Sequence, residues 1–153
     1  FNIEVNRSLR VLDGAIVVFD GVAGVEPQTE TNWRLADKYQ VPRIAFVNKC
    51  DRVGADFVRV VDMMRARLGV MPLPLQMPIG AEGAFRGVVD LLSMRAQLWA
   101  RDDASEPMFE TDVPASLRDA AAQARARLVD TVVEHDDVAL DRVGQPDAEP
   151  GSS

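Results

Sequence analysis

Two short apolar runs, separated by the length of one helix, constrain this fold most. Residues 15–19 and 43–47 are rich in apolar and β-branched side chains and show no regular alternation with polar ones. Such runs are typical of strands that are buried on both faces, as in a parallel sheet. The stretch between them, from Pro27 to about residue 40, has a proline suited to a first helical turn. The sequence therefore predicts a strand–helix–strand unit with its second strand ending at Asn48.

Further helices are predicted on both sides of this unit. Residues 1–12 place apolar side chains at spacings of four, four and three, and a helix from Ala55 or Asp56 is predicted to end at a Gly69 cap. The predicted core-facing residues of the three helices are Phe1, Val5, Leu9 and Leu12; Trp33, Ala36 and Tyr39; and Phe57, Val60, Val61, Met64 and Leu68. This order of elements favours a parallel sheet covered by helices.

The pattern changes after Gly80. Residues 72–79 contain prolines and are predicted to be an edge strand or irregular. Residues 87–91 and 94–99 are predicted to form two antiparallel strands, followed by a polar loop over 102–107. A long helix is predicted from Pro114, with an apolar stripe of Leu117, Ala121, Ala124, Leu128, Val132 and His135. We divide the chain into residues 1–80, an α+β unit over 81–143, and a tail over 144–153 that is predicted to be disordered because it is rich in Gly, Pro and Ser.

Composition narrows the classes of function. The formal net charge of -7 opposes binding to a phosphate backbone, so no autonomous nucleic-acid binding is expected. A single cysteine, Cys50, excludes an internal disulfide and a cysteine-built metal site, and no run of 18 apolar residues predicts a membrane span. We expect a cytoplasmic protein without a membrane partner. The first residues have neither an initiator Met nor a signal pattern, so we also expect an internal piece of something longer.

The sharpest local motif is Asn48-Lys49-Cys50-Asp51, an N-K-x-D at the end of a predicted buried strand. A carboxylate at Asp51 can accept both the ring N–H and the exocyclic amine of guanine, whereas adenine presents no matching pair of donors. Asn48 can bond the other edge of the purine while holding neighbouring loops, and the stem of Lys49 can lie across the base with its ammonium toward the ribose. Open α/β sheets bind ligands at this end of their strands. The alternative is a solvated turn whose polar residues only cap the next helix.

A longer stretch resembles a known family. The segments 3–15, 19–31 and 36–52, including Glu26-Pro27-Gln28-Thr29 and the N-K-x-D, are similar in order and spacing to bacterial elongation factor G. Residues 80–82 and 87–91 resemble the entry to that family's inserted subdomain, and the likeness fades after about Val138. Cys50 departs from the apolar residue usual in the family, at a position whose side chain is expected to point away from the base.

The resemblance implies an α/β fold: part of a doubly wound P-loop GTPase sheet interrupted by an inserted α+β subdomain. The complete protein would be a ribosome-dependent GTPase that drives translocation, using GTP or GDP with Mg²⁺, and its insert would face the ribosomal stalk protein. Asn48, Lys49, Cys50 and Asp51 would form the guanine nucleotide site. No G-x-x-x-x-G-K-[ST] occurs in the 153 residues, so we expect no catalytic residue, no metal ligand and no hydrolysis in this chain alone.

Two alternatives stay open. The first is another translational GTPase, of the ribosomal protection or peptide-release type, although residues 26–29 and 43–47 favour elongation factor G. The second is a non-catalytic fragment that binds a protein through the insert. Other polar or aromatic residues are interpreted as surface or core: His135 as a half-buried surface residue, Cys50 as a small hydrophobe, and Trp33 and Trp99 as core or interface residues. The arginines of the last predicted helix are candidates for a contact face: Arg118, Arg125 and Arg127.

Overall fold

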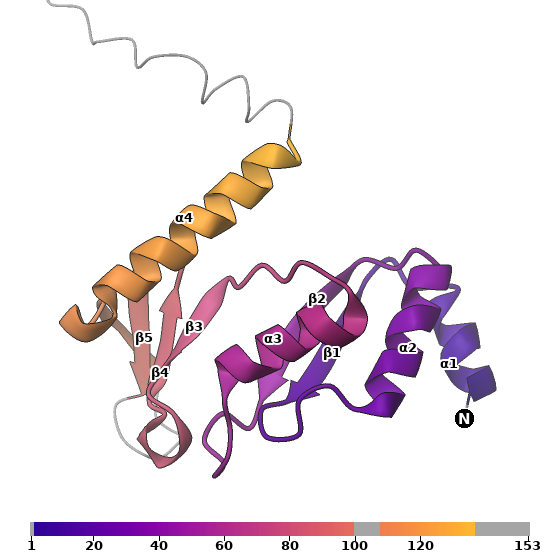
Figure 1. Cartoon of the computed structure of the whole chain (residues 1–153), viewed down its shortest axis with the longest axis horizontal. Coiled ribbons are helices and arrows are strands. Elements are labelled where there is room, and N and C mark those ends of the chain that lie inside the picture. The colour runs from indigo at the N-terminus through magenta and orange to yellow at the C-terminus, as the bar shows by residue number, and fades with distance from the viewer. Residues whose placement is uncertain (1, 100–107, 137–153) are drawn as a thin grey trace, which may run out of the picture.

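Two separate sheets organise the protein, as the computed structural model shows for residues 2–99 and 108–136 (Figure 1). We call the first part the parallel unit; it contains α1 (Asn2–Leu9), β1 (Ala15–Asp20), α2 (Pro27–Lys38), β2 (Arg43–Asn48) and α3 (Phe57–Leu68). We call the second part the antiparallel unit; it contains β3 (Gln76–Ile79), a 3-10 turn (Glu82–Ala84), β4 (Gly87–Asp90), β5 (Arg95–Trp99), β6 (Met108–Asp112), a second 3-10 turn (Ala115–Leu117) and α4 (Arg118–Glu134).

Local signals place the helices of the parallel unit where the sequence predicts them. Pro27 occupies the first turn of α2. The side chain of Asp56 caps α3 by accepting a hydrogen bond from the Arg59 amide at 3.0 Å, and Gly69 ends the helix with a left-handed φ of 64°. Both predicted boundaries of α3 are therefore confirmed.

The parallel pair of strands carries helices on one face. β1 and β2 pair in parallel from Ala15↔Arg43 to Asp20↔Asn48. α2 and α3 together cover the face that holds Phe19, and α1 packs against α2 (Figure 1). The core of this layer contains the buried residues Phe19, Val25, Trp33, Val60 and Met64.

The prediction that both strands are buried on both faces is wrong for this structure. Ile16 and Ile44 are 72% and 64% exposed, and Val18 and Phe46 are 58% and 56% exposed. Successive side chains of a strand point to opposite faces, so these four residues share the face opposite α2 and α3. No element among residues 2–99 and 108–136 covers that face. An apolar run indicates that a strand can be buried on both faces. The burial itself requires another layer of structure on each face.

The antiparallel unit closes its own core. Its sheet has the order β3-β4-β5-β6, and the prediction that the fourth and fifth strands pair antiparallel is confirmed. β3 is an edge strand, as its prolines suggest, whereas β6 was not predicted. α4 lies across the sheet (Figure 1), and the buried residues of this core are Ile79, Val89, Leu91, Ala96, Val113, Ala121 and Leu128.

The predicted apolar stripe of α4 is correct only as far as Leu128. Ala121 and Leu128 are buried, but Val132 is 46% exposed and His135 is exposed rather than half-buried. A helix of 17 residues is about 25 Å long, while strands of four or five residues span roughly 13–17 Å. The end of α4 therefore extends past the sheet, and Val132 there is not covered by any of the residues that the structure describes.

The two units join through residues 69–75. Sheet pairing of the antiparallel unit begins at residue 76, so the division at 80/81 remains a prediction. The predicted loop over 102–107 and the predicted tail over 144–153 lie outside the described residues. In the part of the chain that the structure describes, no helix combines the length and apolar character needed to cross a bilayer.

Candidate functional site

The N-K-x-D residues lie where the sequence predicts, in the turn that follows β2. Asn48 is the last residue of β2 and pairs in register with Asp20 at the end of β1. Lys49 then takes a left-handed backbone with φ of 61°. A non-glycine residue rarely adopts this conformation, and it persists where surrounding contacts hold it. The two strand tips and this turn therefore form one polar edge at the carboxyl ends of the parallel pair.

An ion pair joins the two strand tips. Lys49 Nζ donates to Asp20 Oδ2 at 3.0 Å, while Asp20 Oδ1 accepts the amides of Val22 at 2.8 Å and Ala23 at 3.1 Å. The lysine contact, followed by these two amides, lowers the pKa of Asp20 to about 2. Asp20 thus stays ionised near neutral pH and holds the lysine ammonium at the tip of β1.

Gly21 brings the loop after β1 against the N-K-x-D turn. Its amide donates to the Asn48 carbonyl at 2.8 Å, and its carbonyl accepts the Asp56 amide at 3.0 Å. A Cβ at this position would lie 2.8 Å from the Asn48 carbonyl oxygen, closer than real Cβ atoms approach. Glycine is required here because the two backbones touch. Arg59 of α3 adds hydrogen bonds to the carbonyls of Gly21 and Val22.

Asp51 is exposed at the start of the turn, and its side chain makes no hydrogen bond or ion pair to the described residues. It does not cap α3, because Asp56 does so. Cys50 is half-buried and its thiol donates back to the Val47 carbonyl at 3.6 Å. Burial, and next the charge of Asp51, raises the pKa of this thiol. The carboxylate of Asp51 is therefore available to a ligand, and the cysteine is turned toward the strand.

The antiparallel unit touches the N-K-x-D turn through Glu82, which begins its first 3-10 turn. The Glu82 amide donates to the Cys50 carbonyl at 3.1 Å, and the Gly54 amide donates to Glu82 Oε1 at a long 3.4 Å. Glu82 itself has a left-handed φ of 52°. These contacts of Glu82 brace the N-K-x-D turn in addition to those of Asp20 and Gly21.

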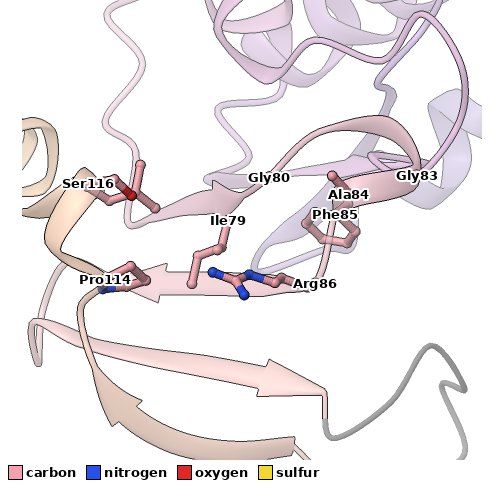
Figure 2. A pocket seen from close by; sticks show the side chains of 9 residues that line it. Ile79, Gly80, Gly83, Ala84, Phe85, Arg86, Pro114 and Ser116 are labelled. Atoms are coloured by element: carbon pink, nitrogen blue, oxygen red, sulfur yellow. The ribbon is translucent and has the colours of Figure 1, made fainter.

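A shallow depression of about 550 Å³ lies elsewhere, between the β3–β4 connection and the second 3-10 turn. Figure 2 shows Ile79, Phe85, Arg86 and Ser116 around it. None of the N-K-x-D residues lines it. Within residues 2–99 and 108–136, no group of three or more His, Cys, Asp or Glu side chains is placed to hold a metal ion.

The other residues singled out by sequence have structural roles. Trp33 is buried and lies 6.1 Å from Phe19 between ring centroids, as expected of a core residue. Trp99 is half-buried and meets Phe85 edge-on at 5.2 Å. Arg125 donates to the carbonyls of Leu91 and Leu92, so it ties α4 to the turn that follows β4. Arg118 and Arg127 are exposed.

Sequence reasoning missed the residues that hold the turn in place. Asp20, Gly21 and Glu82 are far from the motif in sequence and adjacent to it in space. The available signal was the position of Asp20 and Gly21 at the carboxyl end of a neighbouring strand, where parallel sheets gather functional loops. No local pattern indicated Glu82, since its contact depends on how the two units meet.

Comparison with known proteins identifies the family and the fold. The family model described as elongation factor Tu GTP binding domain matches residues 1–140. A solved structure of a protein from Thermus thermophilus matches 95% of the chain with a TM-score of 0.81 and 26% sequence identity. The chain spans 22% of the length of that protein. The predicted fold class, a partial GTPase α/β domain with an α+β insertion, is confirmed.

Proposed function

The chain belongs to the family of elongation factor Tu GTP binding domains, and from this premise we propose that its residues 48–51 select guanine in a ribosome-dependent GTPase. The observation that carries the proposal is the free carboxylate of Asp51 at the carboxyl edge of the parallel pair, beside a lysine fixed by Asp20. A carboxylate that accepts two adjacent N–H donors discriminates guanine from adenine.

Each residue of the motif has a distinct role in the proposal. Asp51 accepts the ring N–H and the exocyclic amine of guanine. The stem of Lys49 covers one face of the base, and its ammonium remains on Asp20. Asn48 bonds the other purine edge and joins the loops. The main chain of Cys50 is braced by Glu82, and its side chain takes no part in base recognition.

The complete protein is proposed to be of the elongation factor G type, promoting translocation. The likeness over residues 26–29 and 43–47 supports this assignment over ribosomal protection or peptide-release GTPases. GTP hydrolysis requires a phosphate-binding loop and Mg²⁺, and the 153 residues contain no G-x-x-x-x-G-K-[ST]. The chain by itself is therefore proposed to be inactive, with the antiparallel unit serving as the surface that meets the ribosomal stalk.

The test is Asp51→Asn in a complete GTPase that carries this segment. The substitution removes two charge-assisted hydrogen bonds of roughly 1.5–3 kcal/mol each, so affinity for GDP should fall about 10²- to 10⁴-fold. Xanthosine diphosphate should gain affinity, because its C2 oxygen meets the new amide donor. Competition between labelled GDP and the two nucleotides measures both changes.

Asp62→Asn is the matched control, because Asp62 is an exposed acid of α3 that pairs only with Arg65 among the described residues. It should leave both affinities unchanged. An Asp51→Asn protein that still prefers GDP over xanthosine diphosphate would contradict the role of Asp51.

A further inference from the structure

The ion pair between Asp20 and Lys49 joins the tips of two neighbouring strands. Asp20 ends β1 and is the register partner of Asn48, which ends β2 immediately before Lys49. The side chains are partly exposed, 47% for Lys49 and 26% for Asp20, and an ion pair at the surface contributes little to folding stability. The contact therefore restricts the position of one long side chain more than it stabilises the fold.

The carboxylate of Asp20 is fixed by the loop that follows β1. Its Oδ1 accepts the amides of Val22 and Ala23, and the Asp20 carbonyl accepts the Gly24 amide at 2.7 Å. Arg59 of α3 donates to the Val22 carbonyl, so the loop is also tied to a helix. Only Oδ2 then remains for the lysine ammonium. Asp20 is thus a fixed anchor for its partner.

Lys49 is a side chain that such an anchor can order. The Lys49 backbone is set in the left-handed region, but a lysine side chain is a flexible four-carbon stem that ends in a strongly hydrated ammonium. The contact with Asp20 at 3.0 Å restricts this stem before a ligand binds. A side chain that is ordered in advance lowers the entropy cost of binding, and this raises affinity.

The two acids at this edge of the sheet are engaged differently. A carboxylate offers about four acceptor positions, and Asp20 uses three of them for two amides and the lysine ammonium. The Asp51 side chain is exposed and makes no hydrogen bond or ion pair to the described residues. Asp20 is therefore suited to hold Lys49, and Asp51 is suited to accept the N–H groups of a base.

We propose that Asp20 is a positioning residue for nucleotide binding: it holds Lys49 so that the lysine stem lies ready against one face of a purine. This rests on the proposed function for the place of the base. The contact of an alkyl stem with a ring face does not depend on the groups at the ring edge. Asp20 therefore raises affinity for guanine and xanthine nucleotides by the same factor, and Asp51 sets the preference between them.

The test measures dissociation of labelled GDP from a complete GTPase that carries this segment. Asp20→Asn keeps an oxygen for the loop amides but removes the charge that holds Lys49. Dissociation should become about two- to tenfold faster, because one long side chain must then be ordered on binding. Lys49→Met removes the same ion pair, keeps an apolar stem, and should have an effect of the same size. In an Asp51→Asn background, Asp20→Asn should weaken xanthosine diphosphate binding by the same factor.

Two comparisons separate positioning of Lys49 from general support of the loop. The double variant Asp20→Asn, Lys49→Met should release GDP no faster than either single variant, because both changes remove one contact. Asp37→Asn is the matched control, since it breaks an ion pair with Arg43 at the opposite end of β2, and it should leave GDP release unchanged. Unchanged release in Asp20→Asn, additive effects in the double variant, an equal effect of Asp37→Asn, or a changed ratio of GDP to xanthosine diphosphate affinity would overturn the proposal.

The Asp51→Asn protein separates this proposal from the proposed function. Faster GDP release in Asp20→Asn that depends on Lys49, together with a GDP preference that persists in Asp51→Asn, contradicts the role of Asp51 alone. A switch of preference in Asp51→Asn, together with unchanged release in Asp20→Asn, contradicts the role of Asp20 alone.

Discussion

The parallel and antiparallel units differ in how far the apolar side chains of their sheets are buried. In the antiparallel unit one face of the sheet is closed by α4, and Val89, Leu91 and Ala96 have no exposed surface. In the parallel unit α2 and α3 close one face only, and the other presents Ile16, Val18, Ile44 and Phe46 to solvent. An antiparallel sheet tolerates one wet face when its residues alternate, but a parallel pair with apolar residues on both faces does not. Among the described residues, the antiparallel unit buries its core under α4, whereas the parallel unit leaves one apolar face uncovered.

Each unit contains one of the two tryptophans, Trp33 in α2 and Trp99 in β5. Single-tryptophan variants therefore let the unfolding of each unit be followed separately in urea. The predictions below use this pair of probes to test the difference between the units.

The largest loss of folding stability is expected from Leu91→Ala. Leu91 is fully buried at the centre of the antiparallel core, and truncation of such a side chain costs about 2–5 kcal/mol through lost burial and the cavity left behind. The unfolding transition followed by Trp99 fluorescence should shift to a lower urea concentration. The transition followed by Trp33 fluorescence should shift much less. Equal shifts of both transitions would show that the two units unfold as one.

A smaller loss of stability is expected from Gly21→Ala in the parallel unit. The new methyl group would press on the Asn48 carbonyl, which we expect to cost roughly 1–3 kcal/mol as overpacking does. Gly83→Ala is the matched control in the antiparallel unit, because a Cβ there meets nothing within 4 Å. A Gly21→Ala chain as stable as the Gly83→Ala chain would show that the contact between the β1 loop and the N-K-x-D turn is loose.

Phe46→Ala should change the stability of the isolated chain by only about 0.5 kcal/mol or less, as exposed substitutions do. Phe46 is 56% exposed on the sheet face opposite α2 and α3. Truncation of a buried Phe would cost several times more stability. Urea unfolding followed at Trp33 measures the change. A loss above about 2 kcal/mol, the scale of a buried truncation, would mean that the face is covered in the free chain.

The smallest expected effect is a change in the pKa of Asp20. Asp20 has a folded pKa of about 2, below the ordinary value of 3.8, chiefly because Lys49 donates to it. A depressed folded pKa favours the folded state above the ordinary value, and this contribution disappears as pH falls through about 2. Lys49→Met should raise the Asp20 pKa toward 3.8, as carboxyl carbon NMR against pH would show. Arg65→Met is the control, because Arg65 is an exposed cation that pairs with Asp62, and it should leave the Asp20 pKa unchanged. An Asp20 pKa that does not change in Lys49→Met would rule out the Lys49–Asp20 ion pair.

The candidate site was only partly predictable. The motif at Asn48–Asp51 and its place after a strand follow from local sequence, because residue order and periodicity are enough to set them. The contacts of Lys49 with Asp20, of Asn48 with Gly21, and of Cys50 with Glu82 join residues about 30 positions apart. No periodic pattern encodes such distances, so the support of the turn appears only after the chain folds.

By itself the sequence determined the helix boundaries at Pro27, Asp56 and Gly69, the two parallel strands, and the position of the N-K-x-D turn. These depend on fixed φ angles, capping side chains and hydrophobic spacing within a few residues. Tertiary structure alone decided that the strands have one uncovered face and that α4 runs past its sheet. Burial depends on which layers of structure pack together. A stretch of sequence can determine which side chains are suited to burial, but it does not determine which element covers them.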